Sequence, residues 1–253
     1  MSSAMVIRGG YVVDPSSGPS GVRDIWISEG RITPPPAAPG EVETIDSAGC
    51  HVFPGLVDFH LHMFHGGTEI GLQPDSALLP QCVTMAVDQG SSGVANCRAF
   101  HAGVLARTGV RAYAFLHVCP AGLATTRYLE DIDPRHFDPV AIRAAVERHK
   151  GVFIGLTIRQ SRELAGEFGL NPLERTLAIA DDLGLPVVVH TTDPAGSVDE
   201  LAGMLRPGDV FSHVYHGRGA TILDVSGAVR PAVRRARERG VLLDTADGRV
   251  HYG

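Results

Sequence analysis

Two histidines one residue apart, His60 and His62, are the residues whose types and spacing most directly suggest chemistry. They lie in a short run at 56–63, in which apolar and polar residues alternate after a Pro-Gly turn signal. Side chains at i and i+2 share one face of an extended chain, so both imidazoles point the same way. Two neutral imidazoles at a strand end can chelate a divalent cation such as zinc. An isolated pair is explained equally well as a polar patch.

The elements that must position these histidines follow a repeating pattern. From residue 56 onward, strand-like runs alternate with helical ones, which is typical of βα units around a parallel sheet. Several of the strand-like runs are continuously apolar, as expected where both faces of a strand are buried. A (β/α)8 barrel has eight strands, and here the count is seven. The sequence therefore predicts a TIM-type (β/α)8 barrel that is incomplete. Strands are expected at 56–63, 83–88, 111–117, 152–158, 186–191, 209–215 and 241–244, and helices at 100–108, 140–149, 171–183, 198–205 and 229–239.

Composition narrows the class of protein. The 253 residues are 44% hydrophobic and 20% charged, which is ordinary for a soluble globular protein. A net charge of -6 gives no reason to expect nucleic acid or an anionic membrane as a partner. No stretch approaches the roughly 20 apolar residues of a membrane span, and the first residues lack the signal-peptide pattern. Four scattered cysteines do not form a disulfide framework. We expect a reduced cytoplasmic enzyme.

A family resemblance appears at residues 54–68. The pattern Pro-Gly-Leu-Val-Asp-x-His-x-His, continued by His-Gly-Gly-Thr, resembles the opening of the barrel in the amidohydrolase superfamily. The tail is similar to that of the deacetylase and dihydroorotase-like branch. This resemblance implies a metal-dependent hydrolase of an amide or ester bond in a small, carboxylate-bearing substrate. It also implies a small β-sandwich before the barrel, so the expected domains are 1–54 for the N-terminal β-sandwich part and 55–253 for the barrel lacking its last strand.

The resemblance assigns four histidines to metal ligation. His60 and His62 form the first pair, and His190 and His213 close or follow later apolar runs. A single histidine closing an apolar strand is more often structural, but the order His-x-His, His, His is fairly specific. Four nitrogen donors can hold one divalent cation, with zinc the expected metal, and the design of the relatives holds two.

Two parts that the resemblance implies are absent. Relatives carry Gly-Leu-Lys-Val-Arg on the fourth strand, and their carbamylated lysine bridges two metals; this chain has Thr157 in the lysine position. A neutral hydroxyl cannot supply the bridging negative charge. Lys150, the only lysine, precedes the strand and cannot replace it. The strand-eight aspartate of the relatives would lie beyond Gly253, so no catalytic residue is assigned. Asp244 and Asp247 are candidate replacements, although a loop or turn role is the plainer interpretation for Asp247.

Substrate contacts are expected near the first strands. Gly66 allows close backbone approach, and His65 could donate a hydrogen bond to a substrate carbonyl. Asn96 lies in a Gly-Ser-Ser-Gly-x-Ala-Asn stretch similar to one in the relatives, and Arg159 could pair with a substrate carboxylate. A structural salt bridge is an equal alternative for Arg159. Cys97 could act as a soft metal ligand, but a buried free thiol is the simpler interpretation.

Three functional hypotheses follow. The first is an amidohydrolase-type metalloenzyme acting on a small molecule. The second is a catalytically impaired or inactive remnant that binds a ligand or serves as a subunit, because residue 157 is threonine and the strand-eight aspartate is absent. The third is an enzyme that uses one metal. An open sheet edge after the seventh strand would favour a homo-oligomer.

Overall fold

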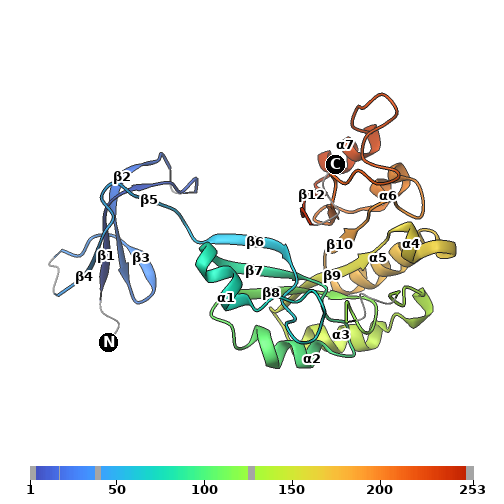
Figure 1. Cartoon of the computed structure of the whole chain (residues 1–253), viewed down its shortest axis with the longest axis horizontal. Coiled ribbons are helices and arrows are strands. Elements are labelled where there is room, and N and C mark those ends of the chain that lie inside the picture. The colour runs from blue at the N-terminus through green and yellow to red at the C-terminus, as the bar shows by residue number, and fades with distance from the viewer. Residues whose placement is uncertain (1–3, 17, 38–40, 125–128, 249–253) are drawn as a thin grey trace. The chain divides into compact units, whose positions relative to one another are not determined.

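The computed structural model describes residues 4–16, 18–37, 41–124 and 129–248. The chain separates into two structural units, Met1–Leu56 and Val57–Gly253 (Figure 1). None of the helices within the described ranges has both the length and the apolar character needed to cross a membrane.

The first unit is a single small sheet. Its strands are β1 (Met5–Val12), β2 (Gly21–Ser28), β3 (Arg31–Thr33), β4 (Glu43–Asp46) and β5 (His51–Val52). β1 pairs antiparallel with β2 and parallel with β4 and β5. The chain passes from β2 to β3 through Glu29 and Gly30, whose φ angles are both positive, as a two-residue hairpin turn requires. The Glu29-Gly30 pair therefore forms the turn between β2 and β3.

The second unit is built on seven strands that follow one another in chain order. They are β6 (Leu56–Leu61), β7 (Val83–Gln89), β8 (Arg111–His117), β9 (Phe153–Arg159), β10 (Val187–His190), β11 (Val210–Ser212) and β12 (Leu242–Asp244). The pairs from β7 to β12 are all parallel. The prediction of an incomplete barrel of seven strands is therefore confirmed for the described residues. Figure 1 shows these strands in order from cyan β6 to red β12.

Helices alternate with these strands. They are α1 (Pro74–Leu78), α2 (Cys97–Phe100), α3 (Pro139–Arg148), α4 (Arg162–Ala165), α5 (Asn171–Leu183), α6 (Val198–Met204) and α7 (Pro231–Glu238). α5 has the predicted bounds because Pro172 opens it and Gly184, with φ +65°, ends it. The helix expected at 100–108 is instead the short α2 followed by a π-helical turn, His101–Leu105. α1 and α4 are too short to show a helical repeat of apolar residues, so the sequence pattern does not predict them.

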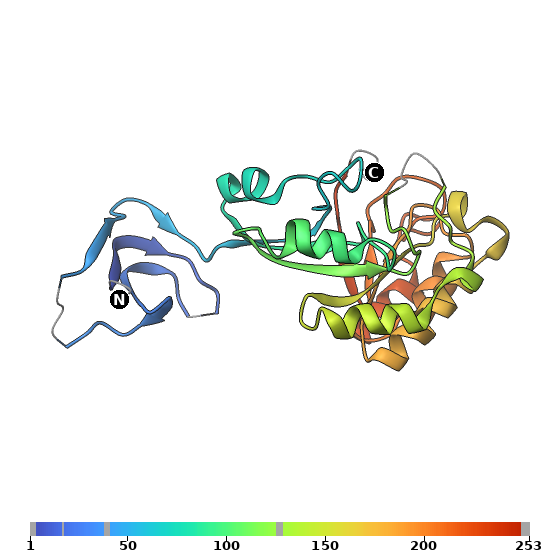
Figure 2. The same ribbon diagram turned by 90° about the horizontal axis from the view of Figure 1, so that it is seen from below.

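Two apolar layers hold the sheet, because successive strand residues face opposite sides. Leu156 and Ile158 of β9 are fully buried in the larger core together with Leu173 of α5. The inner face carries a smaller cluster made of Val87, Phe115, Val188 and Val210. Figure 2 gives a second view, in which helices of this unit lie along the outside of its sheet. On β9, the residues that alternate with Leu156 and Ile158 are Thr157 and Arg159, so these two share the inner face.

The sheet curls until its first and last strands touch. β6 and β12 stand at opposite ends of the strand order, yet Nδ1 of His60 on β6 lies 2.6 Å from Oδ2 of Asp244 on β12. Ser212 of β11 donates a hydrogen bond of 2.8 Å to the same carboxylate oxygen. The carboxyl ends of the seven strands therefore surround one rim, which is where this fold class places chemistry.

Packing of α5 on the sheet provides a test of this architecture. Replacing the fully buried Leu173 with alanine should lower the free energy of unfolding by about 2–5 kcal/mol, because the substitution leaves a cavity in the core. The matched control Val140→Ala, at an exposed position of α3, should change it by less than about 0.5 kcal/mol. Urea denaturation followed by circular dichroism measures both values. Equal losses in the two variants would contradict this packing.

Candidate metal centre

Four histidine rings meet at the rim of the curled sheet. The ring centroids of His190 and His213 are 4.2 Å apart, and those of His60 and His213 are 4.9 Å apart. His62 continues the group, with its ring centroid 6.2 Å from that of His60. The structure thus brings together the four histidines that the sequence singled out. Their role as metal ligands stays a prediction.

His60 is oriented by an acidic partner. Its Nδ1 lies 2.6 Å from Oδ2 of Asp244, and the Ser212 hydroxyl lies 3.1 Å from the same nitrogen. Burial opposes ionisation of Asp244, but the hydrogen bond and charge of His60, followed by the bond from Ser212, lower the pKa of that carboxyl below its ordinary value. An ionised Asp244 accepts the Nδ1 proton of His60, which leaves the lone pair of Nε2 for a cation.

His62 is oriented through a serine. Its Nδ1 lies 3.2 Å from Oγ of Ser91, and that hydroxyl donates its proton to Oδ2 of Asp88 at 2.7 Å. The serine oxygen is therefore the acceptor for the Nδ1 proton of His62. Asp88 also accepts hydrogen bonds from the backbone N–H groups of Met63 and Ser91. Burial raises the pKa of Asp88 to about 6, against these hydrogen bonds.

The electrostatic surroundings keep His62 neutral. Desolvation by the surrounding protein, and next the proximity of His60, lower the pKa of His62 to about 3. A neutral ring whose proton is on Nδ1 offers Nε2 as a ligand atom at neutral pH. His62 therefore has the protonation state that a divalent cation requires.

His213 has the same arrangement through a backbone acceptor. It is buried, and Nδ1 lies 3.0 Å from the carbonyl oxygen of Ala246, which can only accept a proton. The φ angle of +60° at His213 turns the chain sharply after β11, a strained conformation of the kind found at functional sites. For His60, His62 and His213 alike, the protein binds Nδ1, so Nε2 is the remaining donor atom of each ring.

Thr157 stands where the resemblance implies a lysine, and His117, Glu130 and Arg159 lie around it. Thr157 is buried, and its hydroxyl donates to the carbonyl of Val188 at 3.1 Å. His117 pairs in register with Thr157 on the neighbouring β8. Nε2 of His117 lies 3.3 Å from Oε2 of Glu130, and Arg159 forms an ion pair with the other oxygen of Glu130. The salt-bridge alternative for Arg159 is therefore present in the structure.

A second candidate metal-binding group lies here. The potential donor atoms of His117, Cys119 and Glu130 all lie within 4.8 Å of one another, and all three residues are buried. Sequence reasoning missed this group. His117 ends its strand as His190 does, a signal that was available, whereas no pattern marks Glu130, because it follows a strand at no fixed spacing.

The four histidines suit a divalent cation by the type of their donor atoms, although among the described residues no three of them have donor atoms within 4.8 Å of one another. Nitrogen atoms from neutral imidazoles suit zinc, and three of the four rings have their Nδ1 atoms held by protein acceptors. The set does not fit two cations joined by a lysine carbamate, because Thr157 is neutral and its hydroxyl is engaged by Val188.

The predicted substrate residues differ in their surroundings. His65 and Gly66 are exposed next to β6, and Gly66 has a φ of +76°. Asn96 accepts from the N–H of Gly93 and donates to the carbonyl of Ala121, each at 3.0 Å, so both ends of its amide tie loops together. Cys97 is buried in the apolar core, where burial raises the pKa of its thiol. The substrate contacts at His65, Gly66, Asn96 and Arg159 stay predictions.

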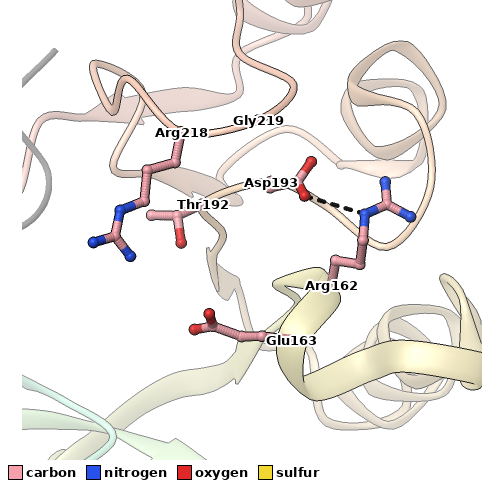
Figure 3. A pocket seen from close by; sticks show the side chains of 6 residues that line it. All are labelled: Arg162, Glu163, Thr192, Asp193, Arg218 and Gly219. Carbon is pink, nitrogen blue, oxygen red and sulfur yellow. Dashed lines mark hydrogen bonds and ion pairs between the residues drawn. The ribbon is translucent and has the colours of Figure 1, made fainter.

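A polar pocket of about 330 Å³ opens near the carboxyl end of β10 (Figure 3). Arg162 pairs with Asp193 at 3.1 Å on one side of it. The figure shows Arg218 and Glu163 on the opposite side, away from that pair. Thr192, which also lines the pocket, lies two residues after His190. The pocket therefore places two guanidinium groups beside a strand that ends in one of the four histidines.

No protein-family model matches the chain. The sequence does match curated proteins. It is 34% identical over 217 residues to deacetylase Atu3266 of Agrobacterium fabrum, a match that covers 85% of this chain and 53% of that protein. It is 33% identical over 217 residues to a deacetylase of Brucella anthropi, covering 85% of this chain and 54% of the relative. The chain thus spans about half the length of these curated relatives.

A solved structure agrees with the sequence comparison. The crystal structure of a dihydroorotase superposes with a TM-score of 0.87 at 28% identity, and the match covers 99% of this chain and 67% of that one. The seven-stranded curl therefore has a counterpart among solved structures. The chain belongs to the amidohydrolase superfamily.

Proposed function

We propose that this chain carries the metal-binding part of a hydrolase that cleaves an amide or ester bond in a small, carboxylate-bearing molecule. The observation that carries the proposal is the set of histidine rings at the rim, three of which have Nδ1 held by Asp244, Ser91 or the carbonyl of Ala246. Such outer partners fix the tautomer and raise the basicity of a metal-binding imidazole. The proposed metal is zinc, and the proposed ligands are His60, His62, His190 and His213.

The chemistry of the proposed reaction divides between the cation and the chain. A bound divalent cation would lower the pKa of water and polarise a substrate carbonyl. The protein holds Nδ1 of His60, His62 and His213 through polar contacts, and Asp244 keeps the Nδ1 proton of His60 in place. Asp244 is thus a positioning residue for His60 in this structure. Its oxygen Oδ2 is already engaged by His60 and Ser212.

A carboxylate on the proposed substrate is supported by three arginines that follow β9 and β11 or end β9. The side chain of Arg159 forms an ion pair with Glu130 and is 24% exposed to solvent. Arg162 and Arg218 line the pocket near the end of β10. Guanidinium groups bind carboxylates through paired hydrogen bonds. The names of the relatives, deacetylase and dihydroorotase, support hydrolysis of a small molecule.

Thr157 favours a second candidate function, a barrel that binds metal or ligand without hydrolysing a substrate. Its hydroxyl is neutral and engaged by Val188, so it adds no charge to the centre. Hydrolysis assays on a panel of N-acetyl amino acids separate the two candidates. Turnover that stops when zinc is removed with a chelator supports the hydrolase, whereas zinc binding without turnover supports the non-catalytic barrel.

Metal content provides the direct test of the centre. The purified chain should hold about one zinc per molecule by elemental analysis, as its four imidazole donors suit a single ion. His213→Ala should lose it, because the substitution removes the ring that contacts both His60 and His190. The control His51→Ala, in the first unit, should keep it. A His213→Ala variant with unchanged zinc would contradict the assignment.

The role of Asp244 can be tested separately. Asp244→Asn keeps the shape of the side chain but removes the charge that holds the Nδ1 proton of His60. Its zinc dissociation constant, measured by competition with a chromophoric chelator, should rise about 10–100-fold. The control Asp247→Asn changes an exposed neighbour and should leave the constant unchanged. Equal affinities of Asp244→Asn and wild type would show that Asp244 does not support the centre.

A further inference from the structure

The polar pocket near the end of β10 lies among the segments that follow three neighbouring strands. Two residues from each segment line it: Arg162 and Glu163 after β9, Thr192 and Asp193 after β10, and Arg218 and Gly219 after β11. β10 ends at His190, and His213 directly follows β11. The pocket volume of about 330 Å³ falls at the small end of the ~300–1,000 Å³ of small-molecule sites. The pocket therefore has room for a small molecule and shares two of its segments with the rim histidines.

One side of the pocket neutralises its own charges. Nε of Arg162 donates to Oδ2 of Asp193 at 3.1 Å, and a terminal nitrogen of the same guanidinium donates to the carbonyl of Pro194 at 2.9 Å. Oδ1 of Asp193 accepts from the backbone N–H of Ala220 at 3.1 Å. A Cβ atom at Gly219 would lie 2.3 Å from the carboxyl carbon of Asp193, so the chain packs closely here. Arg162 and Asp193 therefore form a fixed wall.

The other side of the pocket carries two charged groups that the protein leaves unpaired. Arg218 and Glu163 are exposed, and among the described residues neither side chain forms a hydrogen bond or an ion pair. Figure 3 shows both side chains on the same side of the pocket, with Thr192 between them in this view. The backbone of Arg218 is held in place, because its N–H donates to Nδ1 of the buried His216 at 3.3 Å. Both charged groups are therefore available to a ligand.

The two unpaired groups select different parts of a ligand. The planar guanidinium of Arg218 donates paired hydrogen bonds to a carboxylate. The carboxylate of Glu163 only accepts hydrogen bonds, and so it suits an ammonium group, which only donates them. The hydroxyl of Thr192 can do both, and the backbone N–H of this residue is fixed by Oγ of Ser161 at 3.0 Å. A molecule that matches this side of the pocket carries a carboxylate and an ammonium group close together, as a free α-amino acid does.

We propose that this pocket binds the zwitterionic head of an α-amino acid, with Arg218 on the carboxylate and Glu163 on the ammonium group. The inference rests on the proposed function and narrows its substrate to an amino acid that is acylated on its side chain. Such a molecule keeps the free α-ammonium group that Glu163 selects, and its acyl group is several bonds away from the head. An amino acid acylated on its α-nitrogen has no ammonium group there, so Glu163 discriminates against it.

Three probes separate the two contacts in the wild-type chain. Racemic Nε-acetyllysine carries both head groups, acetamidohexanoate lacks the ammonium group, and N-acetylcadaverine lacks the carboxylate. We expect isothermal titration calorimetry on the full chain, with zinc removed by a chelator, to show the tightest binding for Nε-acetyllysine. Its dissociation constant should be about 10-fold below those of the other two, because each of them lacks one charged hydrogen-bonding group. No measurable binding of Nε-acetyllysine, or equal constants for all three probes, would overturn the inference.

Variants assign each contact to its residue. Glu163→Gln should raise the dissociation constant of Nε-acetyllysine about 10-fold and leave that of acetamidohexanoate unchanged, since this probe has no ammonium group. Arg218→Gln should weaken the binding of both probes. The matched controls Glu167→Gln and Arg237→Gln change exposed residues that do not line the pocket, and both should match wild type. A Glu163→Gln variant that weakens both probes equally, or neither of them, contradicts the assignment.

The outcomes also separate this inference from the proposed function. Selective binding of Nε-acetyllysine by a chain that hydrolyses none of the acetylated amino acids overturns the hydrolase and leaves the pocket assignment standing. Zinc-dependent hydrolysis of Nα-acetyl amino acids, with no preference for Nε-acetyllysine in binding, supports the hydrolase and overturns the pocket assignment.

Discussion

The contact between Nδ1 of His60 and Oδ2 of Asp244 is the interaction on which the rest of the site depends. The two residues are 184 positions apart in sequence and lie on the first and last strands of the curled sheet. A short polar contact at 2.6 Å between these strands fixes how far the sheet must curl at its rim. It also sets the tautomer of His60 and holds an ionised carboxylate beside the ring. The contact that joins β6 to β12 at the rim therefore also positions His60.

Three of the four rim histidines have Nδ1 held by another part of the protein, each by a different kind of group. Nδ1 of His60 lies against a carboxylate, that of His62 against a serine hydroxyl that donates a hydrogen bond to Asp88, and that of His213 against a backbone carbonyl. Each acceptor belongs to a different strand or loop from the histidine that it holds. Imidazoles fixed in this way need little reorganisation to bind a cation, because their protons are already on the nitrogen that faces away from the rim.

The centre departs from the lysine-bridged pattern at one strand. Thr157 directs its hydroxyl to Val188 instead of the rim, and the neighbouring space holds His117, Glu130 and Arg159. Gly90 accommodates this crowding, since a side chain there would meet the methyl group of Thr157 and the ring of His117. A buried set containing a carboxylate, a guanidinium and an imidazole is costly unless its members satisfy one another. His117, Glu130 and Arg159 therefore add a buried charged set to the rim that carries the four histidines.

Much of the framework was determined by the sequence alone. The alternation of apolar runs with helical patterns predicted seven strands and the bounds of α5, because burial on both faces and helix caps act over a few neighbouring residues. The four histidines were also visible, since each ends or follows an apolar run. Only the tertiary structure decided their partners. Asp244, Ser91 and Ala246 come from other strands and loops, and no local pattern records which of them will face a given ring. The physical reason is that curling the sheet creates these contacts, and curling depends on the packing of all seven strands together.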